Sequence, residues 1–142
     1  PEFNVGCRLA PFADDATMDI ELNLAKDKIA AGAAFIVTPP VFDMGQFEKF
    51  MQKASSLGVP IIPTVFLIKS VAVARYIATH EPGAHISEAL IRRIRKSSDR
   101  EMEGVKIAGE TIAQLHKTAQ GVLIQAMGWE HRLAAILDAA GI

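Results

Sequence analysis

Apolar residues recur at helical spacing in two stretches near the start of the chain. In the first stretch these residues are Met18, Leu22, Ala25 and Ile29. Spacings of three and four positions place them on one face, which predicts a helix over Thr17–Ala31 that Gly32 ends. The same periodicity predicts a second helix over Met44–Leu57, and Gly58 ends it.

Short apolar runs between these stretches predict four strands. They are Asn4–Arg8, Phe35–Thr38, Pro60–Phe66 and Gly121–Gln125. The second strand is the centre of the pattern, because it is rich in β-branched residues and reads as buried on both faces. Pro39 and Pro40 are expected to end it, since proline has no N–H to donate to a neighbouring strand. Asp43 then caps the next helix, with Gln46 as its capping-box partner.

The second half of the chain is mostly helical. The pattern predicts helices over Ser70–Thr79, over Glu88–Lys96 and from Ser98 to about Lys117, and a last one over Glu130–Ala140. Ser87 caps the second of these, and Ser98 with Glu101 forms a capping-box pattern for the third.

The predicted elements alternate in the order β-α-β-α-β-α-α-α-β-α. Such alternation favours a parallel sheet with right-handed crossovers, within a single domain that covers residues 1–142. Four βα units are half of an eight-stranded α/β barrel, in which functional residues follow the strands. The fold class predicted is therefore α/β, as the C-terminal half of a (β/α)8 TIM barrel with a helical insertion before its last strand.

The composition and net charge of the chain argue against some classes of function. Half of the residues are hydrophobic, 22% are charged and the net charge is -1, which is typical of a globular protein and attracts neither nucleic acid nor an anionic membrane. No apolar run spans a membrane, and the single Cys7 cannot form an internal disulfide, so a cytoplasmic protein is expected. The chain starts at Pro1 without methionine, and we expect it to be the C-terminal part of a longer protein.

An ordered set of motifs then identifies a family. They are Lys26–Thr38 with its Ala-Gly-Ala and Phe-Ile-Val-Thr segments, Phe42-Asp43, Val59–Pro63, Lys69-Ser70, Ala74–Tyr76, and Gly128–Glu130. In this order and spacing the chain resembles the methylenetetrahydrofolate reductase family, most closely its short bacterial and archaeal members. The resemblance implies a (β/α)8 barrel that transfers hydride from a reduced flavin to methylenetetrahydrofolate. This chain would supply strands five to eight, and the two acids of the family's site would lie upstream, so no catalytic residue is assigned here.

The resemblance also implies ligand-binding residues. For the flavin, FAD or alternatively FMN, Lys28 matches a lysine near the diphosphate and Glu21 matches an acid near the hydroxyls. Arg8 ends the first strand as either an anion ligand or a partner of Asp14 or Asp15. Around the folate substrate we expect Thr38, Gln125 and Lys69, with Trp129 as a structural aromatic. Two positions depart from the family: Pro39 replaces a glutamine that contacts the pterin, and Val71 replaces a stacking phenylalanine.

Other interpretations stay open. A non-catalytic relative would use the domain for assembly or partner binding, and an aldolase-like lyase would need Lys69 as its Schiff-base lysine. The histidines and Cys7 show no metal-ligand spacing, and we expect no metal site. The basic run Arg92–Lys96 is interpreted as a solvated helix face. Because half a barrel leaves two strand edges free, a homo-oligomer is expected.

Overall fold

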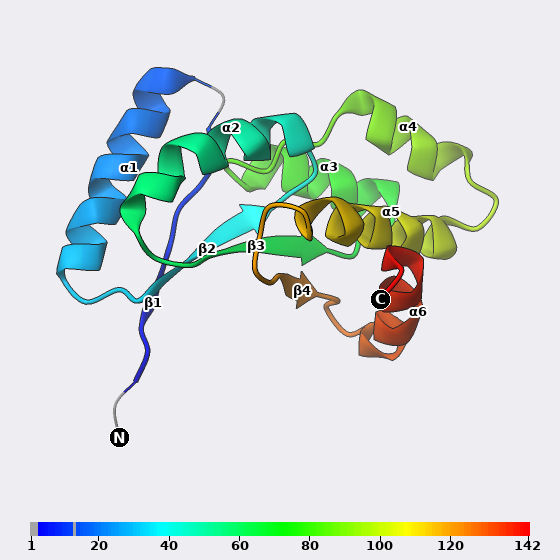
Figure 1. Cartoon of the computed structure of the whole chain (residues 1–142). Coiled ribbons are helices and arrows are strands. Elements are labelled where there is room, and N and C mark those ends of the chain that lie inside the picture. Colours follow the sequence, from blue (N-terminus) through cyan, green and yellow to red (C-terminus); the bar gives the residue numbers. More distant parts are fainter. Residues whose placement is uncertain (1–2, 13) are drawn as a thin grey trace.

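The computed structural model describes residues 3–12 and 14–142, and its centre is one four-stranded parallel sheet (Figure 1). The strands are β1 (Gly6–Arg8), β2 (Phe35–Pro40), β3 (Ile61–Phe66) and β4 (Leu123–Gln125). Each strand pairs with the next one in the chain, in the order β1-β2-β3-β4. The predicted α/β fold with a parallel sheet is confirmed. The outer strands are shorter than predicted, because the chain pairs over only three residues in each.

The described residues also form six α-helices, which lie between and after the strands at the predicted places in the sequence. They are α1 (Asp15–Ala30), α2 (Met44–Ala54), α3 (Val71–His80), α4 (Glu88–Lys96), α5 (Arg100–Leu115) and α6 (Leu133–Ala140), with 3-10 turns η1 (Ser55–Leu57) and η2 (Glu130–Arg132). Gly32 and Gly58 follow α1 and η1 with φ of 113° and 70°, the left-handed backbone expected where a helix stops. Within the described part of the chain, none of the helices combines the length and hydropathy that crossing a bilayer requires.

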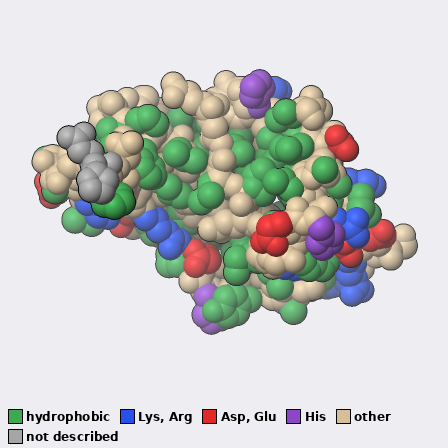
Figure 2. All heavy atoms as spheres, turned by 90° about the horizontal axis from the view of Figure 1, so that it is seen from below, with side chains coloured by type: hydrophobic (Ala, Val, Ile, Leu, Met, Phe, Trp, Pro, Cys, Tyr) green, Lys and Arg blue, Asp and Glu red, His purple; other side chains and the backbone are tan. Residues whose placement is uncertain are grey.

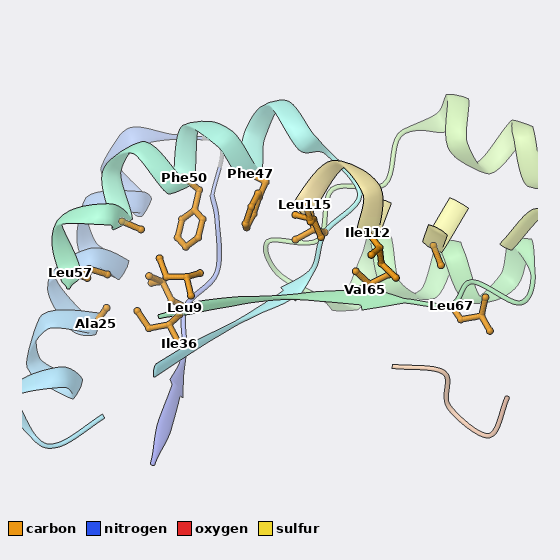
Figure 3. Packing of buried hydrophobic residues seen from close by; sticks show 14 of the residues in the cluster. Leu9, Ala25, Ile36, Phe47, Phe50, Leu57, Val65, Leu67, Ile112 and Leu115 are labelled. Atoms are coloured by element: carbon orange, nitrogen blue, oxygen red, sulfur yellow. The ribbon is translucent and has the colours of Figure 1, made fainter. Parts of the chain in front are cut away.

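The core lies between one face of the sheet and the helices α1, α2 and α5 (Figure 3). From the strands, Ile36 and Val65 point into it and are 0% and 1% exposed. From α2, the rings of Phe47 and Phe50 reach toward them with centroids 5.9 Å apart, and Leu115 of α5 fills the space beside. Burying large apolar side chains at about 1.5–3 kcal/mol each makes this layer the main source of stability.

The end of β2 differs from the prediction. The strand continues through Pro39 and Pro40, which were expected to end it, because the ladder shifts register between Val37 and Pro40. Two buried threonines link the two strands at this register shift. The Thr64 N–H donates to the Thr38 hydroxyl at 3.3 Å, and the Thr64 hydroxyl donates to the Thr38 carbonyl at 2.6 Å. The strand can therefore carry two prolines and still pair with β3.

Helix caps are partly as predicted. Asp43 and Ser87 accept the backbone N–H groups of Gln46 and Leu90 at 3.0 and 3.1 Å, which confirms both caps. The Gln46 side chain does not complete a capping box; it donates to the Pro11 carbonyl at 3.1 Å and ties α2 to the loop before α1.

Ser98 was predicted to cap α5, but the N-cap residue of this helix is Asp99. The Asp99 carboxylate accepts the N–H of Met102 at 3.0 Å, and the Asp99 N–H itself donates to the Ser97 hydroxyl at 3.2 Å. The serine–aspartate turn displaces the cap by one residue, because a carboxylate accepts more strongly than a hydroxyl.

The basic run of α4 contains one residue with a structural role. Arg93 forms ion pairs with Glu103 at 2.5 Å and with Glu110 at 2.7 Å, and so links α4 to α5. The Arg93 guanidinium, through its hydrogen bonds, lowers the pKa of the Glu110 carboxyl below its usual range. Arg93 is nevertheless exposed, as are Arg92, Arg95 and Lys96, in line with the solvated face expected for this run.

We predict that Thr64→Val lowers the free energy of unfolding by about 1–2 kcal/mol, because it removes a buried hydrogen bond to the Thr38 carbonyl at nearly constant volume. Urea denaturation measures this loss. The matched control is Thr111→Val, whose hydroxyl donates to the Ile107 carbonyl within α5. A control loss as large as that of Thr64→Val would contradict the role assigned to the buried pair.

We also predict that Arg93→Ala costs about 0.5–1 kcal/mol at pH 7, since the pair is partly exposed. The lowered pKa of Glu110 means that this contribution is present above about pH 4.3, the unfolded value, and is lost as the pH falls through the folded value. Denaturation at pH 7 and pH 3 should therefore show the difference from wild type shrinking in acid. Arg92→Ala, an exposed neighbour, should change little at either pH.

Candidate functional site

A cavity of about 820 Å³ opens at the carboxyl ends of the strands. All four strands contribute to it, through Arg8, Thr38, Thr64 and Gln125. In a parallel α/β fold this end of the sheet is where ligands bind, because the loops that follow the strands meet there. The cavity brings together four predicted residues: Arg8, Thr38, Gln125 and Lys69.

The floor of the cavity is the threonine pair at the end of β2 and β3. Thr38 and Thr64 are 2% and 1% exposed, and the Thr38 hydroxyl donates to the Pro39 carbonyl at 2.8 Å while it accepts from Thr64. The proton of the Thr38 hydroxyl is thus already used within the protein. Sequence reasoning missed Thr64, although its place near a strand end was a signal that could have found it.

One wall of the cavity is apolar and comes from α3. Val73, Tyr76 and Ile77 line it, at the spacing of one helix face. The Tyr76 side chain is 62% exposed, and its ring stacks on His80 with centroids 4.2 Å apart. An exposed aromatic ring beside a cavity suits a flat ligand. Tyr76 was noted as part of a motif but was not predicted as a site residue.

Arg8 stands at the rim, where its guanidinium contacts the Glu81 carboxylate at 2.5 Å. The prediction that Arg8 pairs with Asp14 or Asp15 is wrong, because both carboxylates bind other groups. Asp14 caps α1 by accepting the Thr17 N–H at 2.8 Å, and hydrogen bonds from Thr17 lower the pKa of its carboxyl. Asp15 instead pairs with Lys53 at 2.7 Å.

Lys28 and Glu21 lie on α1, outside the lining of the cavity. The Lys28 ammonium is nevertheless close to it, since it donates to the backbone carbonyl of Arg8 at 3.4 Å. Glu21 is half-buried two turns earlier in the helix. The structure therefore places Lys28 next to Arg8, a residue of the cavity lining, while Glu21 lies two turns away from Lys28 on α1.

The opposite rim is the loop that follows β4. Lys69 donates to the Met127 carbonyl, and its ammonium lies 4.9 Å from the centre of the Trp129 ring. Met127 has a φ of 50°, which is uncommon for a residue other than glycine and marks a tightly held turn. The N–H of Gly128 donates to the Glu130 carboxylate at 2.9 Å and lowers the pKa of that carboxyl.

Two further residues pack against the hydrophobic clusters. Trp129 is half-buried and packs against the main core, in line with the structural role expected for it. Val71 begins α3 and packs against the smaller cluster around Ile68. Within residues 3–12 and 14–142, no group of three or more His, Cys, Asp or Glu side chains is arranged to hold a metal ion.

Comparisons with known proteins agree with this geometry. The protein-family model described as methylenetetrahydrofolate reductase matches residues 1–141. A search of curated proteins gave no match. Among solved structures, the fold resembles an uncharacterised protein from Clostridium thermocellum that binds two copies of 5-methyl-5,6,7,8-tetrahydrofolic acid, with a TM-score of 0.68, 16% identity and coverage of 95% of this chain and 51% of that one. The chain thus spans about half the length of that protein, and at this identity the likeness shows the fold.

We predict that Glu81→Gln lowers the free energy of unfolding by no more than about 1 kcal/mol, because the side chains of Arg8 and Glu81 are 56% and 36% exposed. Thermal or urea denaturation tests this. A larger loss would mean that the ion pair holds α3 against the sheet and that Arg8 is not available to a ligand.

Proposed function

Because the chain belongs to the methylenetetrahydrofolate reductase family, we propose that it forms strands five to eight of a flavin-dependent oxidoreductase barrel. In the intact protein this barrel would transfer hydride from reduced flavin to methylenetetrahydrofolate, in the cytoplasm. The observation that carries the proposal is the cavity at the strand ends, which gathers Arg8, Thr38, Lys69 and Gln125. The folate-binding neighbour of similar fold supports the same class of ligand.

The residues of the cavity fit a flat, polar-edged ligand of the flavin or pterin kind. Tyr76, Val73 and Phe66 offer apolar surface to a ring system. The Gln125 side chain carries both a donor and an acceptor, as ring edges of this kind require. Phosphate or carboxylate groups of such ligands would meet the positive charge of Arg8 at the rim, and that of Lys28, whose ammonium lies beside the Arg8 backbone.

Flavin, FAD or alternatively FMN, would supply the hydride chemistry when bound. The residues of this chain would bind and orient the reactants. Arg8 and Lys28 would neutralise anionic groups, the α3 wall would exclude water from one side, and Gln125 with Lys69 would hold polar edges of the substrate. Glu21, away from the cavity lining, would reach only an extended part of the cofactor. The proton-transferring acids would come from strands outside residues 1–142.

A specific observation favours a second candidate, a non-catalytic folate or flavin binder. Pro39 lines the cavity where the resemblance implies a glutamine, and proline offers no side-chain hydrogen bond. The lyase interpretation gains no such support. A Schiff-base lysine must lose its charge and keep a free amine, whereas Lys69 is a donor to the Met127 carbonyl and faces the Trp129 ring as a cation.

Reconstitution tests the proposal. The protein that carries this chain is incubated with FAD or FMN, and flavin absorbance and fluorescence quenching report binding. Bound flavin with reduction of methylenetetrahydrofolate supports the oxidoreductase, and bound ligand without turnover supports the non-catalytic binder. A protein that binds neither flavin nor a reduced folate would overturn both.

We predict that Lys28→Ala weakens flavin binding by about 1–3 kcal/mol, the worth of one hydrogen bond to a charged group. Fluorescence titration measures the dissociation constant. Lys96→Ala, an exposed lysine at the end of α4, is the control and should leave it unchanged. Equal affinities for Lys28→Ala and wild type, with the fold intact, would remove Lys28 from the site.

A further inference from the structure

The cavity at the strand ends contains a carboxylate for which the proposed function gives no role. Glu81 lines the cavity together with Arg8, and its Oε2 accepts a hydrogen bond from the Nη2 of Arg8 at 2.5 Å. Arg8 is the last residue of β1, whereas Glu81 directly follows α3, 73 positions later. The cation proposed to receive the anionic group of a ligand is therefore already in contact with an anion of the protein.

Backbone contacts fix the position of Glu81 beside the loop that follows β1. Its N–H donates to the Ile77 carbonyl at 2.9 Å and continues the hydrogen bonding of α3 by one residue. Two positions on, Gly83 has a φ of 85°, and a Cβ added there would lie 2.9 Å from the Cβ of Ala10. Glycine permits both this backbone and this close approach. The two segments are thereby packed together, and the Glu81 side chain starts within reach of Arg8.

The Glu81 carboxylate is held less firmly than its backbone. Within the described part of the chain it contacts a single guanidinium nitrogen, whereas a bidentate pair would engage two. The side chains of Arg8 and Glu81 are both partly exposed, and ion pairs in contact with water contribute little because solvent screens them. Another anion can therefore take the place of the carboxylate on Arg8 without any movement of the backbone.

A phosphate monoester has two advantages over the Glu81 carboxylate. It carries a larger negative charge near neutral pH, and its oxygens can accept two parallel hydrogen bonds from one guanidinium. The Lys28 ammonium, which donates to the Arg8 carbonyl at 3.4 Å, adds a second positive charge beside the same residue. A ligand with a single carboxylate only equals Glu81 in charge, and a neutral ligand has no group that displaces it. Glu81 thus sets a threshold that favours phosphate at the rim.

The ion pair of Arg8 and Glu81 lies where the cavity changes from apolar to charged. Val73 and Ile77 of α3 form part of the apolar wall, and the ion pair forms a charged part of the rim. The same division extends over the side of the molecule that Figure 2 shows, where hydrophobic side chains gather across the middle and charged ones lie mainly toward the edge. A ligand whose rings rest on the apolar wall would direct its charged group toward Arg8.

We propose that Glu81 is a specificity-determining residue of the cavity, which competes with the anionic group of a ligand for Arg8. Before binding, the carboxylate neutralises the guanidinium; on binding, a phosphate displaces it. The inference rests on the proposed function, because it takes a flavin as the ligand, and it adds which charged group the site selects. Glu81 acts through Arg8 and is therefore a positioning residue, not a catalytic one.

Removal of the charge at Glu81 tests the competition. Glu81→Gln keeps the length of the side chain, and fluorescence titration at low ionic strength compares FMN with riboflavin on the protein that carries this chain. FMN should bind the variant about two- to fivefold more tightly than wild type, the worth of one exposed ion pair. Riboflavin, which has the same ring but no phosphate, should bind equally to both. No gain for FMN, or an equal gain for riboflavin, would overturn the inference.

Two further variants separate this role from a general effect of charge. Glu48→Gln removes the same charge from an exposed position of α2, and should leave the affinity for FMN unchanged. In an Arg8→Gln background, Glu81→Gln should give no gain, because the carboxylate then has no cation to compete for. Circular dichroism checks that each variant folds. A gain that persists without Arg8 would show that Glu81 does not act through it, and would also overturn the inference.

Inorganic pyrophosphate distinguishes a failure of this inference from a failure of the proposed function, since it is an anion without a ring. Its binding is followed through the side-chain NMR signals of Arg8, and Glu81→Gln should again tighten it about two- to fivefold. Unchanged or absent pyrophosphate binding would overturn the inference even if flavin binds. Tighter pyrophosphate binding, together with no binding of flavin or reduced folate, would support the inference and overturn the proposed function.

Discussion

The pairing of β2 with β3 is the constraint on which the site depends. Pro39 and Pro40 remove two backbone donors at the point where the strands approach their ends. The buried hydroxyls of Thr38 and Thr64 form hydrogen bonds across the two strands at this point, and the strands stay paired up to the Val41 N–H, which donates to the Thr64 carbonyl at 2.9 Å. An unmade hydrogen bond in this buried place would cost about 1–3 kcal/mol. The same threonines form the floor of the cavity, and fold and site therefore share one set of hydrogen bonds.

Much of the fold was predictable because local signals and burial agree. The helical spacing of apolar residues placed the helices, and the glycines at 32 and 58 placed two of their ends. The predictions were wrong where a neighbour in space replaced the local rule. β2 runs through its prolines because β3 supplies Thr64, and Gln46 leaves its capping box because the Pro11 carbonyl lies within reach. Neither partner is close in sequence.

Close helix packing is a further feature that periodicity alone does not give. The apolar face of α5 was predictable, but not that Gly109 sits against α6. A Cβ added at Gly109 would lie 2.5 Å from the Cβ of Ala139, so only glycine permits this approach. The site residues likewise divide into those that the sequence predicts and those that depend on how distant elements pack. Residues at strand ends, such as Arg8 and Gln125, were predictable from topology, whereas Tyr76 required the position of α3.

The two faces of the sheet differ in how completely their side chains are removed from water. One face is closed by its own helices, so Ile36 and Val65 are removed from water without any partner. On the other face Phe35, Val37 and Ile62 remain only half-buried. Because hydrophobic stabilisation scales with the apolar area removed from water, the first face can support the fold while the second retains a drive to associate.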